Sequence, residues 1–258
     1  MKKSLTPLTP NLRRTLAVLT LPLILIAGTA DAAIVTYTGN DQSVAAGGAR
    51  PNSDAARAAF LGAVTPTGTI TFEGLALGNF GALGVAPGVT ATLTGQDTIA
   101  GIQNANDTTL GYNTTSGGSQ HLRMAPPFNS GPATATFNFA TPISAFGAYL
   151  TGTEVNYPGA INILFFDGSS QSLNVTKNNN GGGVQFFGFT TDALLISSVQ
   201  FYEGPTANTR DIWGIDDVTY GAVAGAVVPE PSTYIAGALL LLPFGSQVIR
   251  RLRTSKQV

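Results

Sequence analysis

Cysteine is absent from the 258-residue chain, and histidine occurs once, as His121. The missing thiols exclude disulfide scaffolds, thiol catalysis and cysteine-based zinc or iron–sulfur centres. A single histidine excludes every catalytic mechanism that needs two histidines. Charge is also scarce, because Asp, Glu, Lys and Arg make up 10% of the chain, whereas an ordinary soluble domain has about 25%.

The few charges are segregated along the chain. Four basic residues lie within the first 14 positions and four within the last nine. Between residues 33 and 228 there are five basic and twelve acidic side chains, which gives this body a net charge of −7. A phosphate backbone would be repelled by that balance, so the sequence predicts no nucleic-acid partner.

The N-terminal basic residues precede an apolar stretch, Leu16–Ala27, that is too short to span about 30 Å of hydrocarbon comfortably. Small residues follow, and both Ala30 and Ala32 end a small-x-small pattern. We predict that residues 1–32 are a secretory signal peptide, cut after Ala30 or Ala32, which would export the protein through the translocon. An uncleaved N-terminal anchor is the alternative.

A second apolar segment, residues 233–249, lies near the C-terminus and is 17 residues long, the lower limit for a transmembrane helix. The basic residues behind it are typical of a stop-transfer signal; they are Arg250, Arg251 and Arg253. The tripeptide Pro229-Glu230-Pro231 stands just before the apolar segment. Residues 229–253 resemble the PEP-CTERM sorting signal of exported proteins, because a short motif is followed by an apolar helix and then by a basic tail.

That resemblance implies a substrate of exosortase, an integral-membrane enzyme that recognises and processes the tail. The protein would then be anchored transiently in the inner membrane and would reach the cell surface or the extracellular matrix of a biofilm. It would act there on or within extracellular polysaccharide. A plain C-terminal membrane anchor is the alternative.

The sequence of the body, residues 33–222, predicts an all-β fold, namely an antiparallel β-sandwich or jelly roll with one short helix. Asp54 is expected to cap that helix, Ala55–Leu61. Residues 104–118 are expected to form a long surface loop, and residues 223–228 a linker. Alternating and β-branched patterns separated by Gly, Pro and Asn turns predict ten strands: 34–38, 69–73, 89–94, 133–139, 143–151, 160–166, 171–175, 184–189, 195–203 and 212–220.

Asp216 and Asp217 are adjacent within the last predicted strand, so one carboxylate is expected to face inward. A buried carboxylate is costly unless it is paired or binds a metal. The pattern is similar to jelly-roll carbohydrate-binding modules that hold Ca²⁺ between an early Glu and a late Asp, which here would be Glu73 with Asp216 and Asp217. The alternative is that the two carboxylates accept hydrogen bonds from the N–H groups of a turn.

No catalytic residues are predicted. No Gly-x-Ser-x-Gly motif accompanies the lone His121, and no pair of carboxylates is distinguished as a glycosidase pair. Tyr112 and Tyr157 stand in loop-like segments and are candidates for stacking on sugar rings. Thr-x-Thr ladders in successive strands are not evident, which ranks ice binding low.

The sequence therefore predicts an exported, exosortase-sorted surface or matrix protein with a non-catalytic structural or adhesive body. The alternatives are a Ca²⁺-dependent carbohydrate-binding module and, less favoured, a secreted glycoside hydrolase.

Overall fold

The computed structural model of the protein describes residues 33–95, 98–100, 108–127, 131–177, 181–192, 194–203 and 211–224. The predicted signal peptide (1–32) and the sorting segment (229–253), with its Pro-Glu-Pro motif and its three arginines, lie outside these residues. In the described part of the chain, no helix combines the length and the hydrophobicity needed to cross a membrane.

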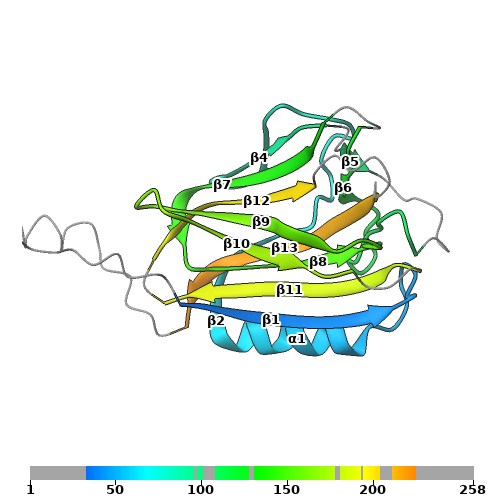
Figure 1. The fold of residues 1–258 in the computed structure, drawn as a ribbon, viewed down its shortest axis with the longest axis horizontal. Coiled ribbons are helices and arrows are strands. Elements are labelled where there is room, and N and C mark those ends of the chain that lie inside the picture. The colour runs from blue at the N-terminus through cyan, green and yellow to red at the C-terminus, as the bar shows by residue number, and fades with distance from the viewer. Residues whose placement is uncertain are drawn as a thin grey trace, which may run out of the picture. The chain divides into compact units, whose positions relative to one another are not determined.

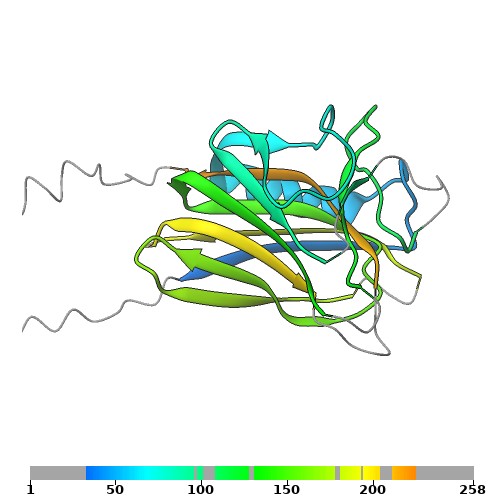
Figure 2. The same ribbon diagram turned by 90° about the horizontal axis from the view of Figure 1, so that it is seen from above.

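The described residues form an antiparallel β-sandwich with one helix, α1 (Pro51–Ala63). The larger sheet has the strand order β1-β11-β8-β13-β6-β5, and β2 also pairs with β13. Its strands are β1 (Ile34–Gln42), β2 (Val64–Ile70), β5 (Thr98–Ala100), β6 (His121–Met124), β8 (Ala145–Thr151), β11 (Gly183–Thr191) and β13 (Trp213–Val223). Figures 1 and 2 show this sheet as one layer, with α1 lying along its outer side.

The smaller sheet has the strand order β10-β9-β12-β7-β4-β3. Its six strands are β3 (Leu83–Ala86), β4 (Val89–Leu93), β7 (Ala133–Ile143), β9 (Tyr157–Phe165), β10 (Ser170–Val175) and β12 (Ile196–Glu203). Every strand pair in both sheets is antiparallel, as the short spacing of the strands predicts.

The main core fills the space between the sheets and is rich in aromatic rings. Phe137 of β7 lies at its centre, with its ring centroid 5.8 Å from that of Phe146 and 6.2 Å from that of Phe201. Trp213 is fully buried beside Phe201, with the centroids 6.0 Å apart. The phenylalanines thus fill the core, as their excess over Tyr and Trp indicates.

A second core lies between α1 and the outer side of the larger sheet. Phe60 of α1 packs on Phe186 of β11, with ring centroids 5.6 Å apart, and Tyr149 of β8 joins them. Because β8 and β11 are covered on both sides, every residue of both strands is buried. This burial explains why their sequences are almost continuously apolar instead of alternating.

The helix is longer than predicted and is capped differently. It begins at Pro51, which suits the first helical position because proline has no N–H to leave unpaired. The N–H groups of Asn52 and Ser53 donate to the carboxylate of Asp41, at 3.1 and 2.7 Å. Burial alone would raise the pKa of Asp41, but these hydrogen bonds outweigh it and the pKa is lowered. Asp54 is therefore not the cap.

Nine of the ten predicted strands are present with shifted ends, the predicted strand 69–73 overlaps β2 only at residues 69 and 70, and the sandwich is confirmed. Three short strands were not predicted: β3, β5 and β6. The predicted linker begins too early, because β13 runs to Val223 and the N–H of Ala224 donates to the carbonyl of Ala63 at 2.9 Å. Threonines pair across β4 and β7 at Thr92–Thr136 and Thr94–Thr134, but Thr90 lies opposite Asn138, and the next strands, β12 and β9, contain no threonine.

Candidate functional site

The segment 108–120 lies across the outer side of the larger sheet and forms neither helix nor strand. It was expected at the surface, yet Tyr112 and Thr114 are buried. Thr151 of β8 binds the middle of this segment. The N–H of Tyr112 donates to Thr151 Oγ1 at 2.9 Å, and the Thr151 hydroxyl donates to the Tyr112 carbonyl at 3.1 Å. A buried loop must find acceptors for its backbone N–H groups, and the nearby carboxylates supply them.

Asp216 accepts two of these N–H groups. The N–H groups of Thr114 and Thr115 donate to Asp216 Oδ2 at 2.6 and 3.1 Å. This arrangement agrees with the alternative for Asp216, which receives N–H groups of a turn, whereas Asp217 accepts the hydroxyls of Thr114 and Thr115. The turn comes from a loop about one hundred residues earlier in the chain, so tertiary structure creates the contact.

Glu73 holds the far end of the same loop. Its Oε1 atom accepts the N–H groups of Ser119 and Gln120, both at 2.7 Å, and the side-chain amide of Asn113 at 2.9 Å. Glu73 and Asp216 thus bind one loop at two points, each with one carboxylate oxygen.

Asp216 and Asp217 face the same side of the sheet, contrary to the alternation expected of adjacent strand residues. The β13–β8 register shifts between Asp216 and Thr219, and Asp217 has a φ of 47°. An Asp tolerates this left-handed conformation better than most residues. The bulge therefore brings both carboxylates to the hydroxyls of Thr114 and Thr115.

These hydroxyls and carboxylates make more contacts than they have hydrogens. Thr114 Oγ1 lies 3.0 Å from Oδ2 of both aspartates, and Thr115 Oγ1 lies 2.7 Å from Asp217 Oδ1. Two hydroxyl hydrogens cannot serve three contacts. Burial, and secondly the charge of Asp217, raises the pKa of Asp216 to about 7. A proton on Asp216 lets Thr114 donate to Asp217.

The predicted calcium site is not assembled. The described residues contain no group of three or more His, Asp or Glu side chains placed to hold a metal ion, and Glu73, Asp216 and Asp217 all lie among them. Their oxygens instead accept hydrogen bonds from the 112–120 loop. The physical reason is that the loop's backbone donors take the place that a cation would occupy.

A second polar group lies where α1 begins. Arg50 donates from Nε to Asp54 Oδ1 at 3.0 Å and from Nη2 to the Thr114 carbonyl at 3.0 Å. Its guanidinium lies 4.2 Å from the centroid of the Tyr149 ring, a cation–π geometry. Tyr149 donates its hydroxyl to Asp54, and burial, followed by this hydrogen bond, raises the pKa of Tyr149. Arg50 is thereby fixed from three sides.

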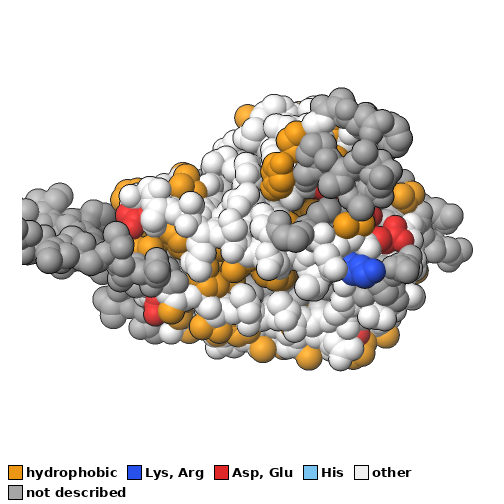
Figure 3. Space-filling view, viewed as in Figure 1, with side chains coloured by type: hydrophobic (Ala, Val, Ile, Leu, Met, Phe, Trp, Pro, Cys, Tyr) orange, Lys and Arg blue, Asp and Glu red, His pale blue; other side chains and the backbone are white. Residues whose placement is uncertain are grey.

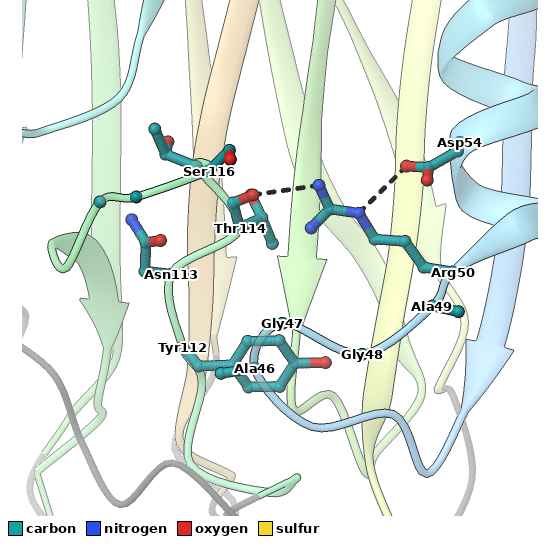
Figure 4. Close-up of a pocket in the computed structure, with 13 residues that line it drawn as sticks. Ala46, Gly47, Gly48, Ala49, Arg50, Asp54, Tyr112, Asn113, Thr114 and Ser116 are labelled. Atoms are coloured by element: carbon teal, nitrogen blue, oxygen red, sulfur yellow. Dashed lines mark hydrogen bonds and ion pairs between the residues drawn. The ribbon is translucent and has the colours of Figure 1, made fainter.

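A cavity of about 470 Å³ opens between two loops beside this ion pair. One loop is residues 46–50, mostly glycine and alanine, and the other is residues 112–118, which is mostly polar. Figure 4 shows Arg50 reaching between Asp54 and Thr114, with Asn113 and Ser116 on the facing loop. Among the described residues, no hydrogen bond engages Nη1 of Arg50, Oδ2 of Asp54 or the Ser116 hydroxyl. The cavity thus offers donors and acceptors together.

The structure places one of the two tyrosines predicted to stack on sugar rings. Tyr112 lines the cavity, but its side chain is only 5% exposed and its hydroxyl donates to the Val44 carbonyl, so its ring face is not free to stack on a sugar. The side chain of Tyr157 lies outside the described residues.

His121 is fully buried, and neither ring nitrogen has a hydrogen-bond partner among the described residues. Burial, and secondly the charge of Arg123, lowers its pKa to about 4, so the imidazole is neutral at pH 7. No serine or carboxylate contacts it in the described structure, which leaves it without the partners of a catalytic triad.

Sequence reasoning missed Arg50, Asp54, Asn113 and Thr114 as a group. Arg50 is one of only five basic residues in the body, and a run of small residues, 45–49, precedes it. Those two signals together could have marked the segment. The facing wall carries no such signal, because Asn and Thr are common throughout this chain.

Comparison with known proteins gives little beyond this geometry. No protein family and no curated protein matches the sequence. Three mutant forms of a family 29 carbohydrate-binding module align with 64% of this chain and 99% of their own, at 11–13% identity and TM-scores of 0.32–0.34. At these values the likeness carries no argument about the ligand.

Proposed function

We propose that the β-sandwich is a non-catalytic carbohydrate-binding module whose ligand occupies the cavity beside Arg50 and Asp54. The observation that carries the proposal is this ion pair, fixed on Tyr149, with a donor and an acceptor left toward the cavity. Neighbouring sugar hydroxyls each donate and accept, so they match a guanidinium N–H and a carboxylate oxygen side by side. Because Arg50 and Asp54 are already held in place before the ligand arrives, binding costs less conformational entropy.

A binding role fits the cavity better than hydrolysis does. Glycoside hydrolysis needs two carboxyl groups about 5–9.5 Å apart across the scissile bond. Asp54 is the one carboxylate among the described residues that line the cavity, and Arg50 holds it as an ion pair. Among the described residues, the cavity therefore lacks the second carboxyl group that hydrolysis needs.

We also propose that the chain is exported and then sorted through Pro229, Glu230 and Pro231 by an exosortase. The motif, the apolar segment 233–249 and the following arginines support this sorting route. The protein would then meet extracellular polysaccharide at the cell surface or in the matrix, which is where a carbohydrate-binding module would act.

The binding proposal is tested with the full-length protein in detergent on an array of bacterial and plant oligosaccharides, followed by calorimetry on the best ligand. Asp54→Asn and Arg50→Met are expected to weaken binding at least about tenfold, the loss typical of one charge-assisted hydrogen bond. Asp167→Asn, on the β9–β10 turn, is the matched control, because Asp167 bonds only to its own turn. Equal binding by all variants would place the ligand elsewhere.

The sorting proposal is tested by the intact mass of the native protein from the membrane and the medium of its own cells. Loss of residues 1–30 or 1–32, together with the chain beyond Pro229, is the expected result. A single species that keeps Arg250 and the residues after it would show an ordinary anchor instead.

A further inference from the structure

The outer side of the six-stranded sheet forms a regular array of uncharged polar side chains. Cross-strand registers align them in rows. We call these residues the polar face: a central row of Ser172, Asn162, Gln200, Thr136 and Thr92, flanked by a row of Ser170, Leu164, Ser198, Asn138 and Thr90 and by a shorter row of Tyr202, Thr134 and Thr94.

Charge is missing from this sheet. Its six strands contain one ionisable acid, Glu203, and no Lys, Arg or His. Glu203 is buried and accepts the indole N–H of Trp213 at 2.9 Å, so it points into the core. In the space-filling view the atoms over β9, β10 and β12 are mostly neither charged nor hydrophobic, and charged atoms appear mainly toward the two ends (Figure 3).

Hydrogen bonds between neighbouring strands hold the central row in place. Ser172 donates to Asn162 Oδ1 at 2.7 Å, Asn162 donates to Gln200 Oε1 at 3.4 Å, and Gln200 donates to Thr136 Oγ1 at 3.1 Å. The chain of contacts crosses four strands and fixes which way each amide points. A ligand that binds these amides therefore does not have to order them first.

The dimensions of the polar face suit an extended ligand. Strands about 4.8 Å apart and side chains repeating about every 6.8 Å along each strand give a surface of about 19 by 14 Å over five strands and three rows. At one end, small residues leave a shallow hollow of about 430 Å³, and this hollow is lined by Gly84, Ala86, Gly88, Val89, Thr90, Asn138, Phe139 and Ala140. The surface is thus wider than one sugar ring.

The chemistry of the polar face selects one kind of partner. A charged polymer would find no counter-charge on the six strands, and protein interfaces take most of their binding energy from Trp, Tyr and Arg, with Ser and Thr under-represented. Hydroxyls and amides match the hydroxyls of a neutral sugar chain. Tyr202 and Leu164, 37% and 45% exposed, add apolar surface for the sugar C–H groups.

We infer that the polar face is a second binding surface, separate from the cavity, for an extended neutral polysaccharide. The inference shares its ligand class with the proposed function but needs none of the cavity residues. One chain would then hold a soluble or branched end in the cavity and a polymer strand on the sheet, which is how a matrix protein could link polysaccharide molecules.

The test is adsorption of the full-length protein in detergent to insoluble neutral polysaccharides: cellulose, mannan, xylan and starch granules. Gln200→Glu keeps the size of the side chain and places a charge in the central row, which is expected to weaken adsorption about tenfold or more. Gln171→Glu is the matched control, since Gln171 is exposed on β10 but pairs with the inward-facing Ile163 and lies outside the rows. Thermal midpoints of both variants verify folding.

The outcomes separate this inference from the proposed function. Asp54→Asn is expected to lose the soluble oligosaccharide while it keeps its adsorption to the polymer. Three results would overturn the inference. The first is equal adsorption by Gln200→Glu and Gln171→Glu, and the second is loss of both ligands with Asp54→Asn. The third is that none of the four polymers retains the parent protein. If the protein causes thermal hysteresis of freezing but does not adsorb to any polymer, the inference is also overturned, because the polar face would then bind ice. Binding of a soluble oligosaccharide in the cavity would survive each of these results.

Discussion

The two outer sides of the sandwich differ in how much of the chain covers them and in whether they carry charge. The outer side of the larger sheet is covered by α1 and by the 108–120 loop, and it holds ionisable residues such as Arg50, Asp54 and Asp216. In the described part of the chain, α1 and the 108–120 loop leave the outer side of the smaller sheet uncovered, and its strands present hydroxyls and amides there without a charge.

The difference shows what the scarce charges of this body are used for. A loop laid on a sheet buries backbone N–H groups, and each needs an acceptor. Glu73 and Asp216 supply two acceptors that can take several N–H groups at once. The bare side buries no loop, so it needs no carboxylates. The predictions below test this contrast, from the largest expected effect to the smallest.

The 108–120 loop approaches β13 closely at Gly111. A Cβ there would lie 2.4 Å from the Gly214 nitrogen and 2.6 Å from the Trp213 carbonyl carbon, in a backbone with φ of 76°. Gly111→Ala is expected to lower the free energy of unfolding by about 4 kcal/mol, because left-handed strain and overpacking add. Urea unfolding measures this loss.

Gly117 is the matched control in the same loop. Its φ of 73° is nearly the same, but a Cβ would meet no atom within 4 Å. Gly117→Ala should therefore cost only the strain of the left-handed backbone, about 1 kcal/mol. Similar losses at both glycines would mean that the loop does not pack on β13.

Removing Asp216, one of the two carboxylates that accept N–H groups of the loop, should have the next largest effect. Asp216→Ala leaves the N–H groups of Thr114 and Thr115 buried without partners, which is expected to cost about 3 kcal/mol. Asp216→Asn keeps an oxygen for these donors and resembles the protonated acid, so it should cost less than about 1 kcal/mol. Chemical denaturation of both variants tests this order, and an equally large loss in Asp216→Asn would show that the negative charge itself holds the loop.

The covered side should also respond to pH through two opposed groups. The raised pKa of Asp216, about 7, makes the folded state bind more protons than the unfolded state, so this group's contribution to stability falls as pH rises from about 4 to 7. The lowered pKa of His121, about 4, acts in the opposite sense, and its contribution rises with pH between about 4 and 6.5. The two slopes largely cancel in the parent protein.

Single substitutions are expected to expose each slope. Asp216→Asn should become more stable from about pH 4.5 to 6.5, and His121→Leu should become less stable, each by about 2 kcal/mol. Asp217 and Arg123, which shift the two groups, stay in place in both variants. Unfolding free energies across this range provide the measurement, and parallel profiles for the two variants would contradict the assignment.

The bare side should tolerate change best. Thr92→Val on the polar face is expected to alter stability by less than about 0.5 kcal/mol, as for most surface substitutions. Thr115→Val on the covered side removes a hydroxyl 2.7 Å from Asp217 and should cost about 1–2 kcal/mol. Thermal unfolding of the pair measures the contrast, which would fail if the two losses were equal.

Much of the sandwich could be predicted from the sequence because strands carry their own pattern. Alternating and β-branched patterns predicted where the strands lie, and the burial of alternate residues in β7 and of every residue in β8 and β11 accounts for those patterns. The short strands β3, β5 and β6 have too few residues to show a period. The cap of α1 was misassigned because its acceptor, Asp41, lies on a strand ten residues before the helix.

The candidate site was less predictable than the fold. Sequence alone pointed to Glu73, Asp216 and Asp217 as important carboxylates, and they are, but for a loop and not for a metal. The bulge at Asp217 reversed the face on which its side chain lies. Neither the bulge nor the cavity wall at Asn113 has a local signature, because both depend on which segment docks on the sheet.

The sequence by itself predicted an all-β sandwich whose body carries few charges, between two hydrophobic ends to which we assign export and sorting only as a proposal. It did so because composition and periodicity are properties of neighbouring residues. Only the tertiary structure decided that Arg50 meets Thr114, that Asp216 holds a loop, and that one sheet keeps an uncharged polar face. Those results depend on contacts between residues far apart in the chain, where register and burial, not local pattern, set the chemistry.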